Sequence, residues 1–312
     1  MDETTTALEA KIQQLLELPA IDLDAPCTFE CQGCGWRCCS DRNDIIATPY
    51  SLLRITWGMQ TLAENYPQWS QALGALLASA IVIEQGCSSL MPLAAVDFKP
   101  TGSGHTICPF LVPADTIPNN GMPLLIRALR ASKRGQDLSQ APLSVCGIYD
   151  VRPNMCRLFP LGRVGTPGES GETEWMYVLQ DVSCGRHGPR TDGLTWGEWI
   201  DTDAQKQNGE GLDLYIAMAE MVRQRLARAG VQADAWLNDG RNQAVLRFAF
   251  YGFPAVVVPS PEQRTHETAM AICQASADLL PQVIDGLLQG TAPDPEKLFA
   301  ALQAALSQPS AD

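Results

Sequence analysis

Apolar residues recur at the spacing of an α-helix in several segments of the chain. Thr48 and Pro49 form an N-cap followed by proline in the first helical position, which predicts a helix through Trp57. A second helix is predicted to begin at Pro67, and a later one to end at Gly230, a favoured C-cap glycine. In the helix that begins at Pro67, the apolar positions are Trp69, Leu73, Leu76, Leu77, Ala80 and Ile81. In the helix that ends at Gly230, they are Leu212, Tyr215, Met218, Ala219, Val222 and Leu226.

Further helices are expected towards the middle and the end of the chain. Pro123 opens a predicted helix over Leu124–Arg134. A long helical region is predicted from Glu262 to Leu288, interrupted at Pro281, because proline breaks the helical hydrogen bonding. A short amphipathic tail is expected over Pro295–Leu306.

The segment Glu174–Val182 is predicted to be a strand, in which Trp175, Tyr177 and Leu179 alternate with Met176, Val178 and Gln180. Two long stretches rich in glycine and proline, Gly86–Pro118 and Gly162–Gly171, are expected to be irregular. Loops of that length are uncommon unless something holds them. The pattern predicts a mainly α fold with small β elements (α+β), in which a loop-rich, cysteine- or metal-stapled core precedes a helical C-terminal region.

Cysteine distribution suggests a division of the chain. Every cysteine except Cys273 precedes the segment Ala204–Gly211, and the chain after it has a helical pattern. We therefore predict three parts. They are an N-terminal helical extension (1–26), a cysteine-cluster metal-binding domain (27–204) and a helical C-terminal region (205–312).

Charge narrows the range of partners. Lys and Arg number 22 and Asp and Glu 35, which gives a net charge of −13 and argues against nucleic acid and anionic membranes as partners. No apolar run reaches the ~18 residues of a membrane span, and the first residues lack the features of a secretory signal. We therefore expect a cytoplasmic protein, in which thiols stay reduced and cysteines more often serve metal or redox chemistry than disulfides.

The 11 cysteines are concentrated at spacings that suit metal ligation. A local cluster reads Cys27-x3-Cys31-x2-Cys34-x3-Cys38-Cys39, and short separations of this kind let a turn direct two thiolates at one ion or cluster. The adjacent Cys38 and Cys39 suggest two neighbouring centres or one polynuclear centre. Single cysteines follow at Cys108, Cys146, Cys156 and Cys184.

These motifs resemble the YkgJ-type CxxCxxCC cysteine-cluster family, described as zinc- or iron-chelating domains. The resemblance lies in Phe29-Glu-Cys31-x2-Cys34-Gly-x2-Cys38-Cys39, in Cys108-Pro-Phe, and in Cys146-x-Ile-Tyr-x2-Arg152-Pro-x2-Cys156-Arg157-x-Phe-Pro-Leu, and it covers about Thr28 to Trp199. It implies eight metal ligands, Cys31, Cys34, Cys38, Cys39, Cys108, Cys146, Cys156 and Cys184. One extra residue separates Cys34 from Cys38 relative to the shortest family pattern.

Other residues are candidates for additional or supporting roles. Cys27, His105 and His187 are possible further ligands, because each lies close in sequence to a matched cysteine. Arg37, Arg152, Arg157 and Arg163 lie beside these cysteines and are expected to neutralise thiolates and donate hydrogen bonds to sulfur. The alternative is that they form ordinary surface salt bridges, which the sequence favours more for Arg163 than for Arg157. Cys273 shares a helical face with apolar residues, which predicts a core thiol. Cys87 follows Gly86 in a loop and is not expected to bind metal.

The spacing favours an iron–sulfur cluster, such as a 4Fe–4S cluster, over zinc or iron ions. Zinc sites usually use compact pairs of cysteines, whereas the later cysteines here are single and widely spaced. Cys27, Cys31 and Cys34 also have the spacing of radical S-adenosylmethionine enzymes, but Gly33 replaces the usual aromatic residue and no strand–helix alternation follows.

Three functions remain open at this point, and the sequence does not decide whether the protein is an enzyme. The first is a metal-binding protein with a redox or metal-dependent catalytic role. The second, implied only by a similar cysteine pattern, is an S-adenosylmethionine-dependent enzyme like the protein lysine N-methylases. The third is a zinc-stapled scaffold whose C-terminal helices bind a protein partner.

Overall fold

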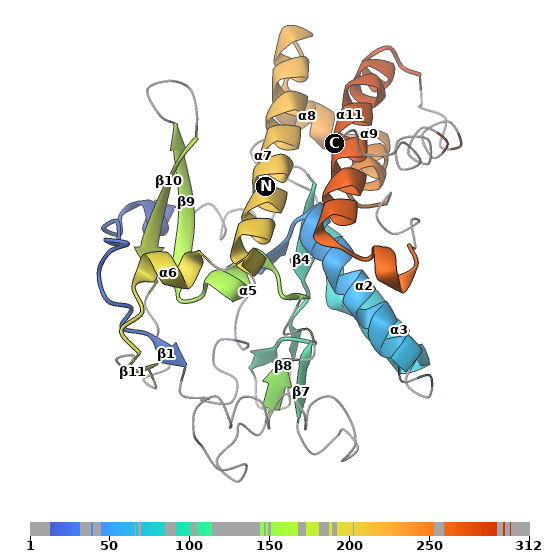
Figure 1. The fold of residues 1–312 in the computed structure, drawn as a ribbon. Helices are drawn as coiled ribbons and strands as arrows, with labels where there is room; N and C mark the ends of the chain where they lie inside the picture. The colour runs from blue at the N-terminus through green and yellow to red at the C-terminus, as the bar shows by residue number, and fades with distance from the viewer. Residues whose placement is uncertain are drawn as a thin grey trace.

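The computed structural model shows a mainly α-helical chain with small antiparallel sheets of two or three strands, as the sequence predicts (Figure 1). It describes residues 13–31, 39, 45–65, 67, 70–84, 92–100, 105–113, 144–146, 148, 151–167, 173–180, 187–188, 192–201, 203–252, 259–291, 296 and 300. The helix predicted at Leu124–Arg134 and nearly all of the tail predicted at Pro295–Leu306 lie outside these residues.

The helices are α2 (Pro49–Asn65), α3 (Ser70–Ala80), α5 (Asn154–Leu158), α6 (Trp196–Ile200), α7 (Asp203–Arg228), α8 (Ala233–Leu237), α9 (Gly240–Arg247) and α11 (His266–Leu288), with a π-helical turn η5 (Phe248–Gly252) and a 3-10 turn η6 (Pro261–Gln263). The start of α2 and the end of α7 agree with the capping residues, whereas α5, α6, α8 and α9 were not predicted from the sequence. α2 begins at Pro49 as predicted and continues beyond Trp57. Gly230 follows α7 with a φ of 68°, a conformation that glycine adopts readily.

The strands are short and pair antiparallel. They are β1 (Glu30–Cys31), β2 (Ile46–Ala47), β3 (Ile81–Glu84), β4 (Leu93–Val96), β5 (Lys99–Pro100), β6 (Thr106–Ile107), β7 (Leu111–Pro113), β8 (Ser144–Cys146), β9 (Leu161–Pro167), β10 (Thr173–Leu179) and β11 (His187–Gly188). β2, β4 and β3 form a three-stranded sheet, and β9 pairs with β10 along its whole length. β10 confirms the strand predicted from Glu174.

Two stretches predicted to be irregular contain strands, so that prediction is wrong. Gly162–Gly171 overlaps β9, and Gly86–Pro118 contains β4 to β7. Glycine and proline lower strand propensity locally, but Leu161 and Val164 are buried in the β9–β10 hairpin, and such packing outweighs propensity. Ile81, predicted on a helical face, instead begins β3.

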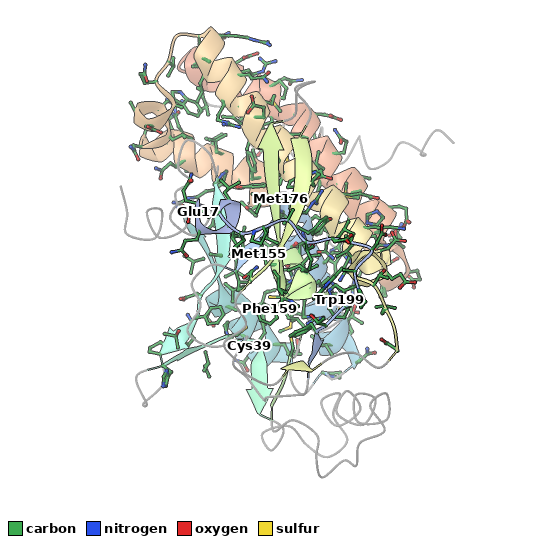
Figure 2. The ribbon with its side chains drawn as sticks, turned by 90° about the vertical axis from the view of Figure 1, so that its left-hand side faces the viewer. Glu17, Cys39, Met155, Phe159, Met176 and Trp199 are labelled. Atoms are coloured by element: carbon green, nitrogen blue, oxygen red, sulfur yellow. The ribbon has the colours of Figure 1, made fainter. Side chains whose placement is uncertain are left out.

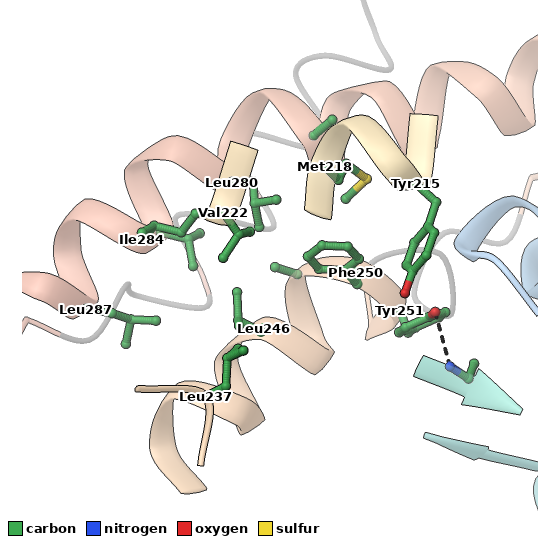
Figure 3. Close-up of a cluster of buried hydrophobic side chains, with 14 of the residues drawn as sticks. Tyr215, Met218, Val222, Leu237, Leu246, Phe250, Tyr251, Leu280, Ile284 and Leu287 are labelled. Atoms are coloured by element: carbon green, nitrogen blue, oxygen red, sulfur yellow. Dashed lines mark hydrogen bonds between the residues drawn. The ribbon is translucent and has the colours of Figure 1, made fainter. Parts of the chain in front are cut away.

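A large hydrophobic cluster lies between α7, α11 and the α9–η5 segment, and we call it the Phe250 cluster (Figure 3). Its buried members from these helices and from α8 include Tyr215, Met218, Val222, Leu226, Leu237, Leu246, Phe250, Tyr251, Leu280, Val283, Ile284 and Leu287. The α7 members recur at helical spacing, as the sequence predicts. Figure 1 shows α7 and α11 as two long helices packed side by side.

Tyr251 joins the Phe250 cluster to the three-stranded sheet. Its hydroxyl accepts a hydrogen bond from the Ala94 N–H at 3.2 Å (Figure 3) and donates to the Pro92 carbonyl oxygen at 3.1 Å. Complete burial raises the pKa of Tyr251, so the phenol stays protonated and available as a donor. The helical C-terminal part is thereby attached to the strands that follow α3.

Pro281 lies inside an unbroken helix, so the predicted interruption of the last helical region is wrong. Proline removes one helical hydrogen bond and costs about 3 kcal/mol in a helix interior. Nevertheless α11 continues from His266 to Leu288. Leu280, Val283 and Ile284, on either side of the proline, are completely buried in the Phe250 cluster. Burial of side chains this size contributes about 1.5–3 kcal/mol each, which offsets the cost of the proline.

The predicted domain boundary at Ala204–Gly211 falls within α7. The early turns of α7 contact α2 through Gly211 and Tyr50, and its later turns contribute to the Phe250 cluster. A continuous helix thus connects the two parts, and their division stays a prediction. Within the expected N-terminal extension, residues 13–16 are helical, and the Ile21 N–H then donates to the Tyr177 carbonyl oxygen of β10 at 2.8 Å.

Gly211 allows α7 to approach α2 closely. A Cβ atom at this position would lie 2.6 Å from both Cβ and Cγ of Tyr50, whose side chain is itself buried. We therefore expect Gly211→Ala to lower the free energy of unfolding by about 1–3 kcal/mol, the usual cost of overpacking, despite the better helix propensity of alanine. Urea unfolding followed by circular dichroism measures this change.

Gly74 provides the matched control for Gly211. It lies in α3, and an added Cβ would meet nothing within 4 Å. Gly74→Ala is expected to raise the free energy of unfolding by about 0.5–1 kcal/mol, because alanine has the better helix propensity. Equal stabilisation by both alanines would contradict the close packing of α7 on α2.

Candidate functional site

The structure describes the side chains of four of the eight cysteines expected to bind metal. These are Cys39, Cys108, Cys146 and Cys156, each of intermediate burial. Cys34, Cys38, Cys184 and Arg37 lie outside the described residues, as do the side chains of Cys31 and His187. The geometry of the candidate site is therefore built from the four described cysteines and the elements that carry them.

Three of these cysteines contact one hydrophobic cluster, which we call the Phe110 cluster. Its buried members are Ile45, Ile55, Met59, Ala80, Val96, Phe110 and Ile148. Cys108, Cys146 and Cys156 are partly buried and pack against it. Three cysteines that are up to 48 positions apart in the sequence thus pack against the same hydrophobic cluster.

Short strands and a turn bring Cys39, Cys108 and Cys146 into the same region. The Cys108 N–H donates a hydrogen bond to the Cys39 carbonyl oxygen at 2.8 Å, which places these two backbones directly beside each other. Three residues after Cys108, Leu111 of β7 pairs with Cys146 of β8. Cys39 from the local cluster therefore lies beside Cys108, and Cys146 lies on the strand that pairs with the segment after Cys108.

The short helix α5 positions Cys156. The side chain of Met155, labelled in Figure 2, accepts a hydrogen bond through its Sδ from the Ile46 N–H at 3.4 Å, which links α5 to β2. Arg157 Nε donates to the Arg152 carbonyl oxygen at 3.2 Å, so the two arginines on either side of Cys156 are in contact. Their expected role beside the thiolates stays a prediction.

A second apolar cluster, formed by Cys27, Phe29, Leu161 and Trp196, lies beyond α5, and we call it the Trp196 cluster. Cys27 is buried, and its thiol donates to the Phe29 carbonyl oxygen at 3.6 Å. The Phe29 ring lies edge-on to Phe159 and Trp199, with centroids 6.0 and 6.3 Å away. Phe159 follows Cys156 by three residues, so α5 connects the two clusters.

The two histidines considered as ligands lie on short strands or beside them. His187 in β11 is the antiparallel backbone partner of Cys31 in β1, which brings its segment beside the local cysteine cluster. His105 is exposed and immediately precedes β6, three residues before Cys108. Among the residues that the structure describes, no three His, Cys, Asp or Glu side chains are close enough together to hold a metal ion.

Cys273 is a core thiol, as predicted. It is 2% exposed in α11 and packs with Tyr50, Leu53, Trp57, Ala269 and Ile272. Burial raises the pKa of the Cys273 thiol from 9.0 to about 12. The unfolded thiol ionises from pH 9 upward while the folded one stays protonated, so its contribution to stability is complete below pH 9 and declines as the pH rises towards 12.

The buried thiol predicts slow chemistry at Cys273. Because the thiolate is the nucleophile, iodoacetamide at pH 8 is expected to alkylate Cys273 about a thousandfold more slowly in the native protein than in urea. Mass spectrometry of the peptide that contains Cys273 measures the two rates. Equal rates would show that the residue is accessible in the folded chain.

A hydrogen-bonded chain that was not predicted from the sequence connects α2, α7 and α11. His266 Nδ1 lies 3.0 Å from the buried Tyr50 hydroxyl, and His266 Nε2 lies 2.8 Å from Glu210 Oε2. Burial raises the pKa of Tyr50, which keeps the phenol protonated. Spacing within one segment cannot reveal such a chain, since its members come from three helices.

Arg163 forms a salt bridge, the alternative considered for it from the sequence, although it is more buried than a surface residue. Its Nη2 lies 3.2 Å from Asp213 Oδ1, and its side chain is 10% exposed. The guanidinium lies over the Trp175 ring, 3.6 Å from the centroid.

Within the described residues, no helix is both long and apolar enough to cross a membrane. Comparison of the chain with protein-family models, with curated proteins and with solved structures found no match.

Proposed function

We propose that the protein binds an iron–sulfur cluster, or else iron or zinc ions, through its cysteines and uses it in redox or metal-dependent catalysis. The observation that supports this proposal is that Cys108, Cys146 and Cys156 pack against the Phe110 cluster, with the backbone of Cys39 hydrogen-bonded to Cys108. Thiolates are the ligands that both iron–sulfur clusters and structural zinc prefer. The resemblance to the YkgJ-type family implies the same chemistry.

The donor set suits the proposed metal chemistry. Cys108, Cys146 and Cys156 are only partly buried, so their sulfur atoms combine access with an apolar surrounding, which strengthens charge interactions. In this proposal the ligand set is completed by Cys31, Cys34, Cys38 and Cys184. Arg152 and Arg157, in contact beside Cys156, would offset the thiolate charge.

The arrangement favours iron–sulfur over zinc ligation. Structural zinc sites commonly take their ligands from two close pairs, whereas Cys108, Cys146 and Cys156 come from a loop, a strand and a helix. A cytoplasmic location, where thiols stay reduced, belongs to the same proposal.

Anaerobic purification with elemental analysis and a visible spectrum tests the proposal. We expect bound iron and acid-labile sulfide, with a broad visible absorption that bleaches on addition of a reductant. Stoichiometric zinc with no visible absorption would instead support the zinc-stapled scaffold. A protein that binds no metal after anaerobic reconstitution with iron, sulfide or zinc would contradict metal binding altogether.

A further inference from the structure

A cleft of about 350 Å³ opens between α5, the β9–β10 hairpin, α6 and the start of α7. Its walls include Asn154, Leu158, Arg163, Tyr177, Ile200 and Gln205. It is distinct from the cysteine region, although α5 borders both. Asn154 and Leu158 lie one helical turn apart on the cleft side, whereas Cys156, between them in the sequence, packs against the Phe110 cluster.

Three polar side chains of this cleft have buried atoms without a hydrogen-bond partner in the described part of the chain. They are Asn154 Oδ1, Arg163 Nε and Gln205 Oε1. Asn154 is 7% exposed, and buried polar groups are otherwise nearly always paired. Two acceptors and one donor left unsatisfied at one cleft indicate a place where a ligand completes the hydrogen bonding.

The structure holds Arg163 in place, with its Nε buried and without a hydrogen-bond partner. Its Nη2 binds Asp213, and its guanidinium lies over the Trp175 ring. A Cβ atom at Gly209 would lie 3.3 Å from Arg163 Nη1, so the glycine gives the guanidinium room beside α7. Unlike Arg163, the side chains of Asn154 and Gln205 can rotate at the amide group, because the terminal torsion angles of Asn and Gln have broad distributions. A small rotation would turn their oxygen atoms into the cleft.

Charge at the cleft favours a cation. The carboxylates of Asp201, Glu210 and Asp213 outnumber the cationic groups of Arg163 and Lys206. Lys206 lies 2.7 Å from Asp201, and Arg163 pairs with Asp213, which leaves Glu210 as the excess negative charge beside His266. A ligand carboxylate would be repelled, so the acceptor offered to Arg163 should be a neutral oxygen.

We propose that this cleft binds a small hydroxylated amine, with an amino sugar as the representative of its class. The ammonium group donates to the amide oxygens of Asn154 and Gln205, and a hydroxyl oxygen accepts from Arg163 Nε. The cleft is within the ~300–1,000 Å³ of small-molecule sites, which accommodates a ligand of this size. The site depends on no metal ligand, so it stands whether or not the cysteines bind a cluster.

Calorimetric titration of the full-length protein with three matched sugars tests the proposal. We expect D-glucosamine to bind about tenfold or more tightly than D-glucose, which lacks the ammonium group, and D-glucuronate to give no binding. Binding of glucose or glucuronate as tight as that of glucosamine, or no binding of glucosamine at millimolar concentration, would overturn the proposal.

Variants connect the binding to the unpaired atoms. Gln205→Met and Asn154→Leu are expected to weaken glucosamine binding by about tenfold or more while the unfolding midpoint of the ligand-free protein stays the same or rises, because each removes an unsatisfied buried acceptor. Gln224→Met makes the same change in α7 outside the cleft, where Gln224 donates to Glu220, and should leave binding unchanged. Unchanged affinity in both cleft variants would overturn the assignment.

Discussion

Replacing Cys156 by serine is expected to remove most of the bound metal and to lower the free energy of unfolding by several kcal/mol. Metal binding contributes about 10–16 kcal/mol to the folding of small zinc domains, because the site does not exist in the unfolded chain. Here the short strands and turns around the Phe110 cluster have few internal hydrogen bonds of their own. Metal content by elemental analysis and thermal unfolding measure the two effects. Cys38→Ser and Cys39→Ser are expected to act in the same direction.

Cys273→Ser is the matched control for the metal site. The thiol of Cys273, on α11, is buried in a hydrophobic cluster with Tyr50 and Ile272. Replacing this cysteine by serine is therefore expected to leave the metal content unaltered. It should still lower stability to some extent, because a hydroxyl is buried in place of the thiol. Loss of metal in Cys273→Ser with full metal content in Cys156→Ser would reject the assignment of ligands.

Leu280→Ala is expected to lower the free energy of unfolding by about 2–5 kcal/mol, the range observed for leucine truncation in protein cores. Leu280 is completely buried and packs between α11 and α7 in the Phe250 cluster (Figure 3). The rigid helices around it cannot close the cavity that the truncation leaves. Because Pro281 follows directly, loss of this packing also removes part of what keeps α11 unbroken. Urea unfolding measures the change.

Leu179→Ala makes the same substitution at the end of β10. Leu179 is 41% exposed, so its truncation removes little buried surface. We expect a change of about 0.5 kcal/mol or less, as for most surface substitutions. Equal destabilisation by the two variants would show that Leu280 does not lie in a rigid core.

Local signals in the sequence predict the elements of this fold well where each signal is confined to one segment. Pro49 begins α2, Gly230 follows the end of α7, and the strand predicted after Glu174 is β10, because caps, glycines and strand-forming residues act within a few positions. The predictions fail where distant packing decides. β9 contains glycines and ends in proline, yet pairs with β10, and Pro281 remains helical because its neighbours are buried.

The candidate sites divide in the same way. The spacing of Cys31 to Cys39 and the single cysteines predict a metal site, since ligand spacing is visible in a sequence. The cleft beside α5 has no such signal. Asn154, Arg163 and Gln205 come from a helix, a strand and another helix, and only their common burial without partners distinguishes them from ordinary polar residues.

The continuous course of α7 has a mechanical consequence. The helix has 26 residues and is therefore about 39 Å long. Its first turns border the cleft, and its last turns lie in the Phe250 cluster. If the helix moves as a rigid body, a tilt of about 5° at one end displaces the other end by about 3 Å. Any rearrangement near α5 would thus be carried to the surface formed by the far ends of α7 and α11.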